Sequence, residues 1–284
     1  MIAQSALSWS AFVLYTAAAF AALGYLFSKD ARASRAMLVL LTLGVVLHAL
    51  AVAVHVAAFW AYPENRWFLP LNNFYGALSY MAFALAAAFL AVEARNRLGI
   101  LGAFVLPWAA LALGAAVALA NPQAQPLAPA LRSYWLNLHP VLLMTAYAAF
   151  ANAAGVAVAL LIQERQIKSR KPTELCYRLP SLDELDGLNA KIVASAYPVL
   201  IVGLVMGFVW AYRDWGRVWT GDPKLTLAVL TAVVYGAFLW QHFVGGRRGR
   251  RPVYVSLAGF ASALVTFFGA ELLSGRHAYL GGGR

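Results

Sequence analysis

The chain has few charged residues for its length of 284, because only 12% are Asp, Glu, Lys or Arg whereas 62% are hydrophobic. A water-soluble domain usually carries about 25% charged residues, so this composition excludes an ordinary soluble fold. Cysteine is also scarce, since Cys176 is the only one. A single cysteine excludes an internal disulfide, a CxxC redox pair and any metal site built from several cysteines. The composition therefore points to an integral membrane protein.

The sequence instead contains long runs of apolar residues. A helix needs about 20 mainly apolar residues to cross the hydrocarbon layer, and eight stretches satisfy this condition. They cover residues 7–27, 36–60, 72–92, 98–120, 138–162, 191–210, 223–244 and 253–273. We therefore expect an all-α integral membrane protein, with residues 1–284 forming a single polytopic domain built as a bundle of about eight transmembrane helices. The first run is long enough to span and lacks a basic start, so it reads as a helix rather than a cleaved signal peptide.

The formal net charge of +11 is explained by where the cations fall. Fifteen of the 22 Lys and Arg residues lie in alternate connections, at 29–35, 95–97, 163–191 and 247–251. By the positive-inside rule these connections are cytoplasmic, which puts both termini outside. The lipid bilayer thus accounts for the basic charge, and we expect no nucleic-acid partner. Residues 163–190 are expected to form a cytoplasmic linker with a short surface helix.

The five histidines are the first candidates for chemistry, because ionisable residues at membrane depth are costly and usually functional. His48 and His55 lie seven residues apart on nearly one face of the second span, where a packed histidine bonded to a carbonyl is the commoner explanation for either alone. His139 begins the fifth span and His277 follows the eighth, so both are expected on the outer side. His242 lies about 30 Å along the seventh span at 1.5 Å per residue, near the cytoplasmic side.

Residues 210–224 are expected to form an external loop that is unusually rich in aromatic rings and also carries cations. Its candidate binding residues are Trp210, Arg213, Trp215, Arg217, Trp219 and Asp222. Trp215 and Trp219 stand at i, i+4 spacing, so a short helix could present both rings as one plate suited to a flat aromatic cofactor. The alternative is a Trp/Tyr anchor at the headgroup level. Asp222 before Pro223 is also a typical helix start.

The run 215–224 resembles the tryptophan-rich WGxxWxWDPKE motif of the CcsA/ResC type of cytochrome c assembly proteins, which handle haem. Segments 70–75, 138–147, 235–242 and 274–279 resemble further parts of that family in the same order. Gly221 departs from the motif in place of its third Trp, and Leu225 in place of its Glu. Leu225 cannot close a capping box with Asp222, although the sister CcmC-type proteins also end this motif with a Leu-Thr pair.

The resemblance implies a function in cytochrome c biogenesis, namely haem transport and presentation for covalent attachment to apocytochrome c. It implies a ResB-type membrane partner, haem b as the bound group, and a bacterial cytoplasmic (inner) membrane with the Trp-rich segment on the periplasmic side. His139 and His277 would be external axial ligands. His242 would be one ligand of an inner haem, completed by a partner histidine or by His48.

The remaining roles follow from the same resemblance and from charge. The tryptophans would cover the macrocycle, while the cations nearest to the haem propionates would be Arg213, Arg217, Lys224 and Arg276. The chain would then be a candidate subunit of a holocytochrome c synthase (haem lyase) complex. A HemX-like scaffold or haem-sensing regulator without attachment activity is the alternative, favoured by Gly221 and Leu225; an unrelated channel or transporter is a third.

Overall fold

The computed structural model describes residues 2–28, 30–127, 129–169, 172–216, 219 and 223–273. Within these residues every regular element is helical, and eight helices are long and apolar enough to cross a membrane. The expected all-α membrane bundle is therefore confirmed. The eight are α1 (Ile2–Ser28), α2 (Ala31–Phe59), α3 (Phe74–Asn96), α4 (Gly102–Leu119), α5 (Tyr134–Lys168), α7 (Leu182–Trp215), α8 (Pro223–Leu239) and α9 (Arg250–Leu273).

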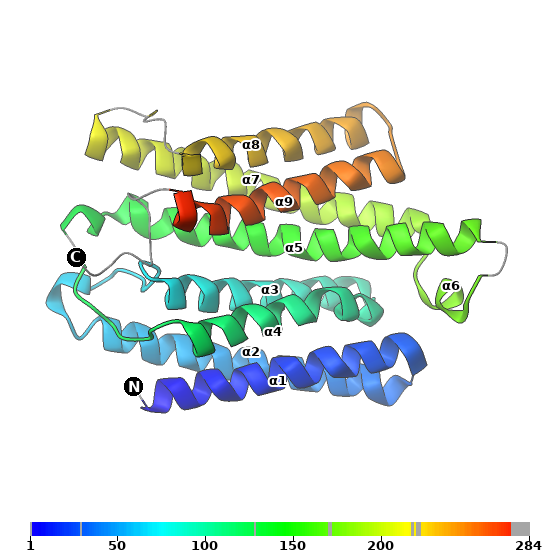
Figure 1. Ribbon diagram of the computed structural model, residues 1–284, viewed down its shortest axis with the longest axis horizontal. Coiled ribbons are helices and arrows are strands. Elements are labelled where there is room, and N and C mark those ends of the chain that lie inside the picture. Colours follow the sequence, from blue (N-terminus) through cyan, green and yellow to red (C-terminus); the bar gives the residue numbers. More distant parts are fainter. Residues whose placement is uncertain are drawn as a thin grey trace.

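The helices run up and down along one axis, and each packs on a few neighbours (Figure 1). α1 packs on α2 and α4, α5 packs on α3, α7 and α9, and α8 packs on α9. The turns that follow α1, α3, α5 and α8 gather at one end, which we call the basic end because the four basic connections lie there. The other end, the Trp end, holds the end of α7 and the start of α8. The described chain begins and ends at the Trp end.

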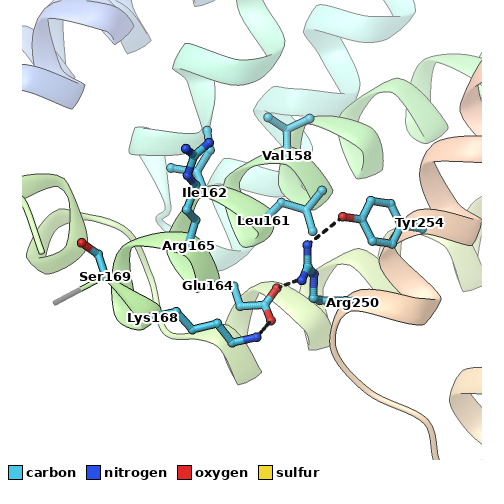
Figure 2. Close-up of a pocket in the computed structure, with 9 residues that line it drawn as sticks. All are labelled: Val158, Leu161, Ile162, Glu164, Arg165, Lys168, Ser169, Arg250 and Tyr254. Carbon is cyan, nitrogen blue, oxygen red and sulfur yellow. Dashed lines mark hydrogen bonds and ion pairs between the residues drawn. The ribbon is translucent and has the colours of Figure 1, made fainter.

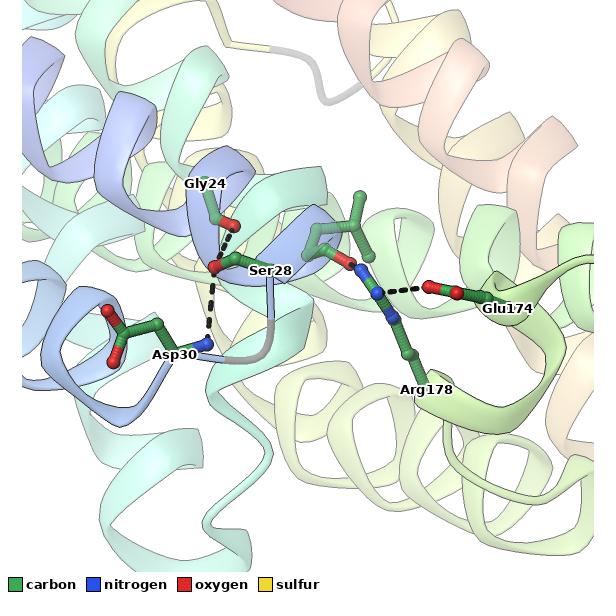
Figure 3. A network of polar contacts seen from close by, with 6 residues as sticks. Gly24, Ser28, Asp30, Glu174 and Arg178 are labelled. Atoms are coloured by element: carbon green, nitrogen blue, oxygen red, sulfur yellow. Dashed lines mark hydrogen bonds and ion pairs between the residues drawn. The ribbon is translucent and has the colours of Figure 1, made fainter.

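A short helix, α6 (Glu174–Arg178), lies against the end of α1 at the basic end (Figure 3). Nη1 of Arg178 donates a hydrogen bond to the carbonyl oxygen of Leu26 at 3.1 Å. This carbonyl is one of the last four of α1, which have no partner inside the helix. Ser28 Oγ accepts from the backbone N–H of Asp30 at 3.2 Å. α6 and the tight turn thus close the end of α1.

Two helices extend well beyond the apolar runs that predicted them. α7 begins at Leu182 and ends at Trp215, rather than covering 191–210 alone. α5 continues to Lys168, six residues past the expected end. Much of segment 163–190 is therefore the last turns of α5 and the first turns of α7, with α6 between them. The segment 210–224, which is rich in tryptophan, likewise begins inside α7, because that helix continues to Trp215.

Candidate functional site

His139 lies near the start of α5, at the Trp end, and is fixed by a hydrogen bond to α7. Its Nδ1 is 2.7 Å from the carbonyl oxygen of Gly203. A carbonyl oxygen can only accept, so Nδ1 carries the proton and donates it. The neutral imidazole then has its lone pair on Nε2. A metal-ligating histidine usually donates a hydrogen bond of this kind from the ring nitrogen that does not bind the metal.

Gly207 makes the space that the His139 ring occupies. A Cβ placed on Gly207 would stand 2.6 Å from Cε1 of His139 and 2.7 Å from its Nδ1, closer than real Cβ contacts allow. Gly203 and Gly207 are four residues apart, so they lie on one face of α7. Small residues at this spacing let two membrane helices approach closely. The α7 backbone therefore both holds the imidazole and leaves room for it.

An aromatic ring and a cation lie one turn from His139 toward the Trp end. Trp135 precedes His139 by four residues on α5, so the two share a face of the helix. The Arg213 guanidinium carbon on α7 lies 5.3 Å from the centroid of the Trp135 ring, within the range of a cation–π interaction. The contact between Arg213 and Trp135 thereby connects the end of α7 to the start of α5, one helical turn from His139.

The structure changes the expected shape of the Trp-rich segment. Trp210 and Arg213 lie on the last turns of α7, not in a loop. The helix ends at Trp215 because Gly216 has a left-handed conformation with φ of 69°. The prediction that Trp215 and Trp219 share a helical plate is therefore wrong. Trp219 lies past the helix end with 55% of its surface exposed.

Several of the predicted residues cannot be placed. The side chain of Trp215 lies outside the described part of the chain, and so do Arg217, Asp222 and His277. The pairing of His139 with His277 therefore stays a prediction. Within the described ranges, no three His, Cys, Asp or Glu side chains gather into a metal site; an axial haem site needs only one or two protein ligands.

His242 lies at the opposite end of the bundle from His139. It follows α8 in a π-helical turn, Trp240–Val244, and such turns are frequently found at functional sites. Phe238 stacks on its ring with centroids 6.0 Å apart, and Phe243 meets the ring edge-on at 4.9 Å. The depth predicted from helix rise agrees with this position at the basic end.

Asp186, on α7, faces His242. Its Oδ2 is 3.6 Å from His242 Nδ1, with both side chains about one-tenth exposed or less. This distance is longer than a hydrogen bond. The other carboxylate oxygen of Asp186 accepts from the backbone N–H of Gly249 at 3.3 Å. Asp186 thus connects α7, the π-helical turn and the start of α9 around the histidine.

His48 is a structural histidine. It has no exposed surface, and both ring nitrogens are engaged: Nδ1 lies 3.2 Å from the Tyr15 hydroxyl and Nε2 lies 2.9 Å from the Ser79 hydroxyl. These partners come from α1 and α3, so His48 holds α2 between its neighbours. The option that His48 completes an inner haem site is not supported, because no ring nitrogen is left for iron.

His55 belongs to a polar cluster nearer the Trp end. Its Nδ1 is 2.9 Å from the Gln4 side-chain nitrogen, and its ring meets Tyr75 edge-on at 5.2 Å. The Tyr75 hydroxyl in turn lies 2.9 Å from that of Ser8. Like His48, His55 thus ties α2 to α1 and α3, far along the bundle from His242.

Sequence reasoning missed three groups that support the histidines: Trp135, the Gly203 and Gly207 pair, and Asp186. The glycine spacing was a readable signal, because small residues four apart mark close helix contacts. Asp186 falls within residues 163–190, which the sequence predicts to be a cytoplasmic linker. Only the helix extension to Leu182 brings it inside the bundle.

A comparison with known protein families identifies the chain. The family described as Cytochrome C assembly protein matches residues 71–277. The chain belongs to this family. As a cytochrome c assembly protein it has a role in cytochrome c biogenesis, which confirms the resemblance derived from the motifs. The matched range contains His139, His242 and His277, whereas His48 and His55 precede it.

Relatives of this cytochrome c assembly protein are similar over most of their length. "Cytochrome c biogenesis protein CcsA" of Synechococcus elongatus is 30% identical over 251 residues, covering 72% of this chain and 77% of the relative. The protein of the same name from Prochlorococcus marinus (strain MIT 9303) is 33% identical over 234 residues, covering 72% and 74%. The chain is thus similar to CcsA proteins.

A solved structure shares the fold of this cytochrome c assembly protein. "Cytochrome c Heme Lyase CcmF" superposes with a TM-score of 0.72 at 18% identity, covering 99% of this chain and 48% of that one. The chain therefore spans about half the length of that lyase. At this identity the likeness concerns the fold alone.

Proposed function

We propose that this chain binds haem at the Trp end and presents it for covalent attachment to apocytochrome c. One observation carries the proposal: the His139 imidazole is oriented by donation from Nδ1 to Gly203 and cradled by Gly207. Donation from Nδ1 puts the lone pair of the neutral imidazole on Nε2, which is the atom proposed to ligate the haem iron. Membership in the family and likeness to proteins named CcsA support the same function.

His277 is the proposed second axial ligand, and haem b is the proposed cargo. Two neutral imidazoles on opposite faces hold the iron of a low-spin haem. Arg213 places a positive charge at this end, suited to a propionate, and Trp135 and Trp219 offer apolar ring surface. The membrane is proposed to be the bacterial cytoplasmic membrane, with the Trp end toward the periplasm, because the cations gather at the other end.

His242 is proposed to bind haem at a separate inner site. α8 is continuous from Pro223 to Leu239, so His242 lies about 28 Å from the start of that helix at 1.5 Å per residue. One haem cannot reach across this distance. Both ring nitrogens of His48 are engaged, so a histidine of a ResB-type partner is the proposed second ligand. Asp186 helps to hold the His242 ring in place.

The function is tested by purifying the chain, together with a ResB-type subunit, from cells supplied with ample haem. A Soret band and the α band of a bis-imidazole haem are expected, and cells carrying the complex should mature a reporter cytochrome c. A colourless preparation of the folded complex would refute haem handling. It would instead favour a HemX-like scaffold without attachment activity.

A further inference from the structure

A second polar site lies at the basic end, on the surface between α5 and α9, and none of the functions above uses it. It is an open pocket of about 730 Å³. Its lining combines the apolar side chains of Val158, Leu161 and Ile162 with the cations Arg165, Lys168 and Arg250 (Figure 2). A pocket with these two kinds of wall suits a ligand that is itself partly apolar and partly charged.

The charged part contains three cations and one carboxylate. Glu164 forms ion pairs with Lys168 and, at 3.2 Å, with Arg250. Arg250 also donates to the Tyr254 hydroxyl at 3.0 Å, so these groups form one chain of contacts in Figure 2. Arg165 forms no ion pair with any residue that the structure describes. The pocket therefore keeps an excess of positive charge after Glu164 is neutralised.

The apolar and charged parts are separated along the membrane normal. Val158, Leu161 and Ile162 lie on α5 further into the membrane than Arg165 and Lys168, since α5 runs toward the basic end. The pocket thus has apolar surface at the depth of the lipid acyl chains and cations at the depth of the headgroups. A phospholipid has its apolar and charged parts in the same order. A basic pocket between membrane helices is also a known way to hold an anionic headgroup.

From this arrangement we infer that the pocket between α5 and α9 binds an anionic phospholipid. Its phosphate lies beside Lys168 and Arg250, and one acyl chain lies along α5 against Leu161 and its neighbours. The Arg165 side chain points away from these two cations in Figure 2 but adds positive charge to the same pocket. The bound lipid bridges the end of α5 to the start of α9, next to the turn that carries His242. This inference rests on the pocket alone and does not depend on haem binding.

Native mass spectrometry of the purified chain tests the inference, with phosphatidylglycerol and phosphatidylethanolamine of matched acyl chains as probes. The anionic lipid should be retained in preference to the zwitterionic one. Arg165→Gln should weaken its retention about fivefold, the effect of one cation near an anionic headgroup. Arg165 has no ion pair to lose among the described residues, so this variant should fold normally.

Arg251→Gln is the matched control, because Arg251 is exposed, adjoins Arg250 and does not line the pocket. It should leave lipid retention unchanged. Equal retention of the two lipids, or equal loss in Arg165→Gln and Arg251→Gln, would overturn the inference. Displacement of the lipid by micromolar haem would also overturn it, because the pocket would then serve the cargo's carboxylates instead.

Discussion

Replacing Gly207 with alanine is the sharpest perturbation that the proposed haem site offers, because it adds one methyl group beside His139. The new Cβ would stand 2.6 Å from Cε1 of the imidazole, whereas ordinary contact begins at about 3.4 Å. The ring must therefore retreat by about 0.8 Å. A shift of this size weakens the 2.7 Å hydrogen bond from Nδ1 to Gly203.

The expected cost falls on haem binding more than on folding. An imidazole can rotate away from the methyl group, so the bundle should absorb the change at about 1–3 kcal/mol, the usual cost of overpacking. Loss of the orienting hydrogen bond should weaken haem binding at the Trp end by roughly 10–100-fold, as is typical when the support of a metal ligand is removed.

Gly187→Ala is the control on the same helix. A Cβ at Gly187 meets nothing within 4 Å, and alanine there should if anything favour the helix. Haem titrations of both variants, followed at the Soret band in detergent, give the comparison. The reasoning fails if Gly207→Ala binds haem as tightly as Gly187→Ala. It also fails if Gly207→Ala weakens haem binding as much in a His139→Ala background as in the unmodified chain, because its effect would then not act through His139.

Three further results are expected. His242→Ala should deplete haem from both sites if haem moves from the inner site to the outer one, and an unchanged outer haem content in this variant would exclude the relay. Asp186→Asn should lower the inner haem content by about tenfold or less, because the contact of Asp186 with His242 is longer than a hydrogen bond. Trp135→Ala removes the ring beneath Arg213 and should weaken outer haem binding about two- to fivefold by titration, the range of one cation–π contact. Reporter fusions after Ser169 should behave as cytoplasmic, and an external signal would reverse the assigned orientation.

The sequence predicted the number and order of the spans because the hydrocarbon layer imposes a length of about 20 apolar residues. The apolar run predicts a shorter helix than α7, because a membrane helix can continue into the polar interface, where hydropathy no longer marks its residues. Ser181 caps that helix by accepting from the N–H of Glu184 at 3.3 Å, a pattern of the capping-box kind. Reading this pattern would have placed the helix start at Leu182 and Asp186 inside the bundle.

The site was less predictable than the fold. The i, i+4 spacing of Trp215 and Trp219 predicts that both rings lie on one face of a helix. The left-handed conformation of Gly216 ends α7 before Trp219. Nor does hydropathy distinguish a π-helical turn such as Trp240–Val244 from the α-helix that it continues. The contact between His139 and Gly203 joins residues 64 positions apart, so it depends on how α5 and α7 pack.

The central claim, that His139 ligates haem at the Trp end, is tested most directly by His139→Gly in the purified complex, with and without added imidazole. The glycine variant leaves a cavity of ring shape beside Gly207, which free imidazole can enter. We expect the bis-imidazole Soret and α bands of the outer haem to disappear in the variant and to return with millimolar imidazole. A spectrum identical to that of the unmodified complex, with no response to imidazole, would contradict the account.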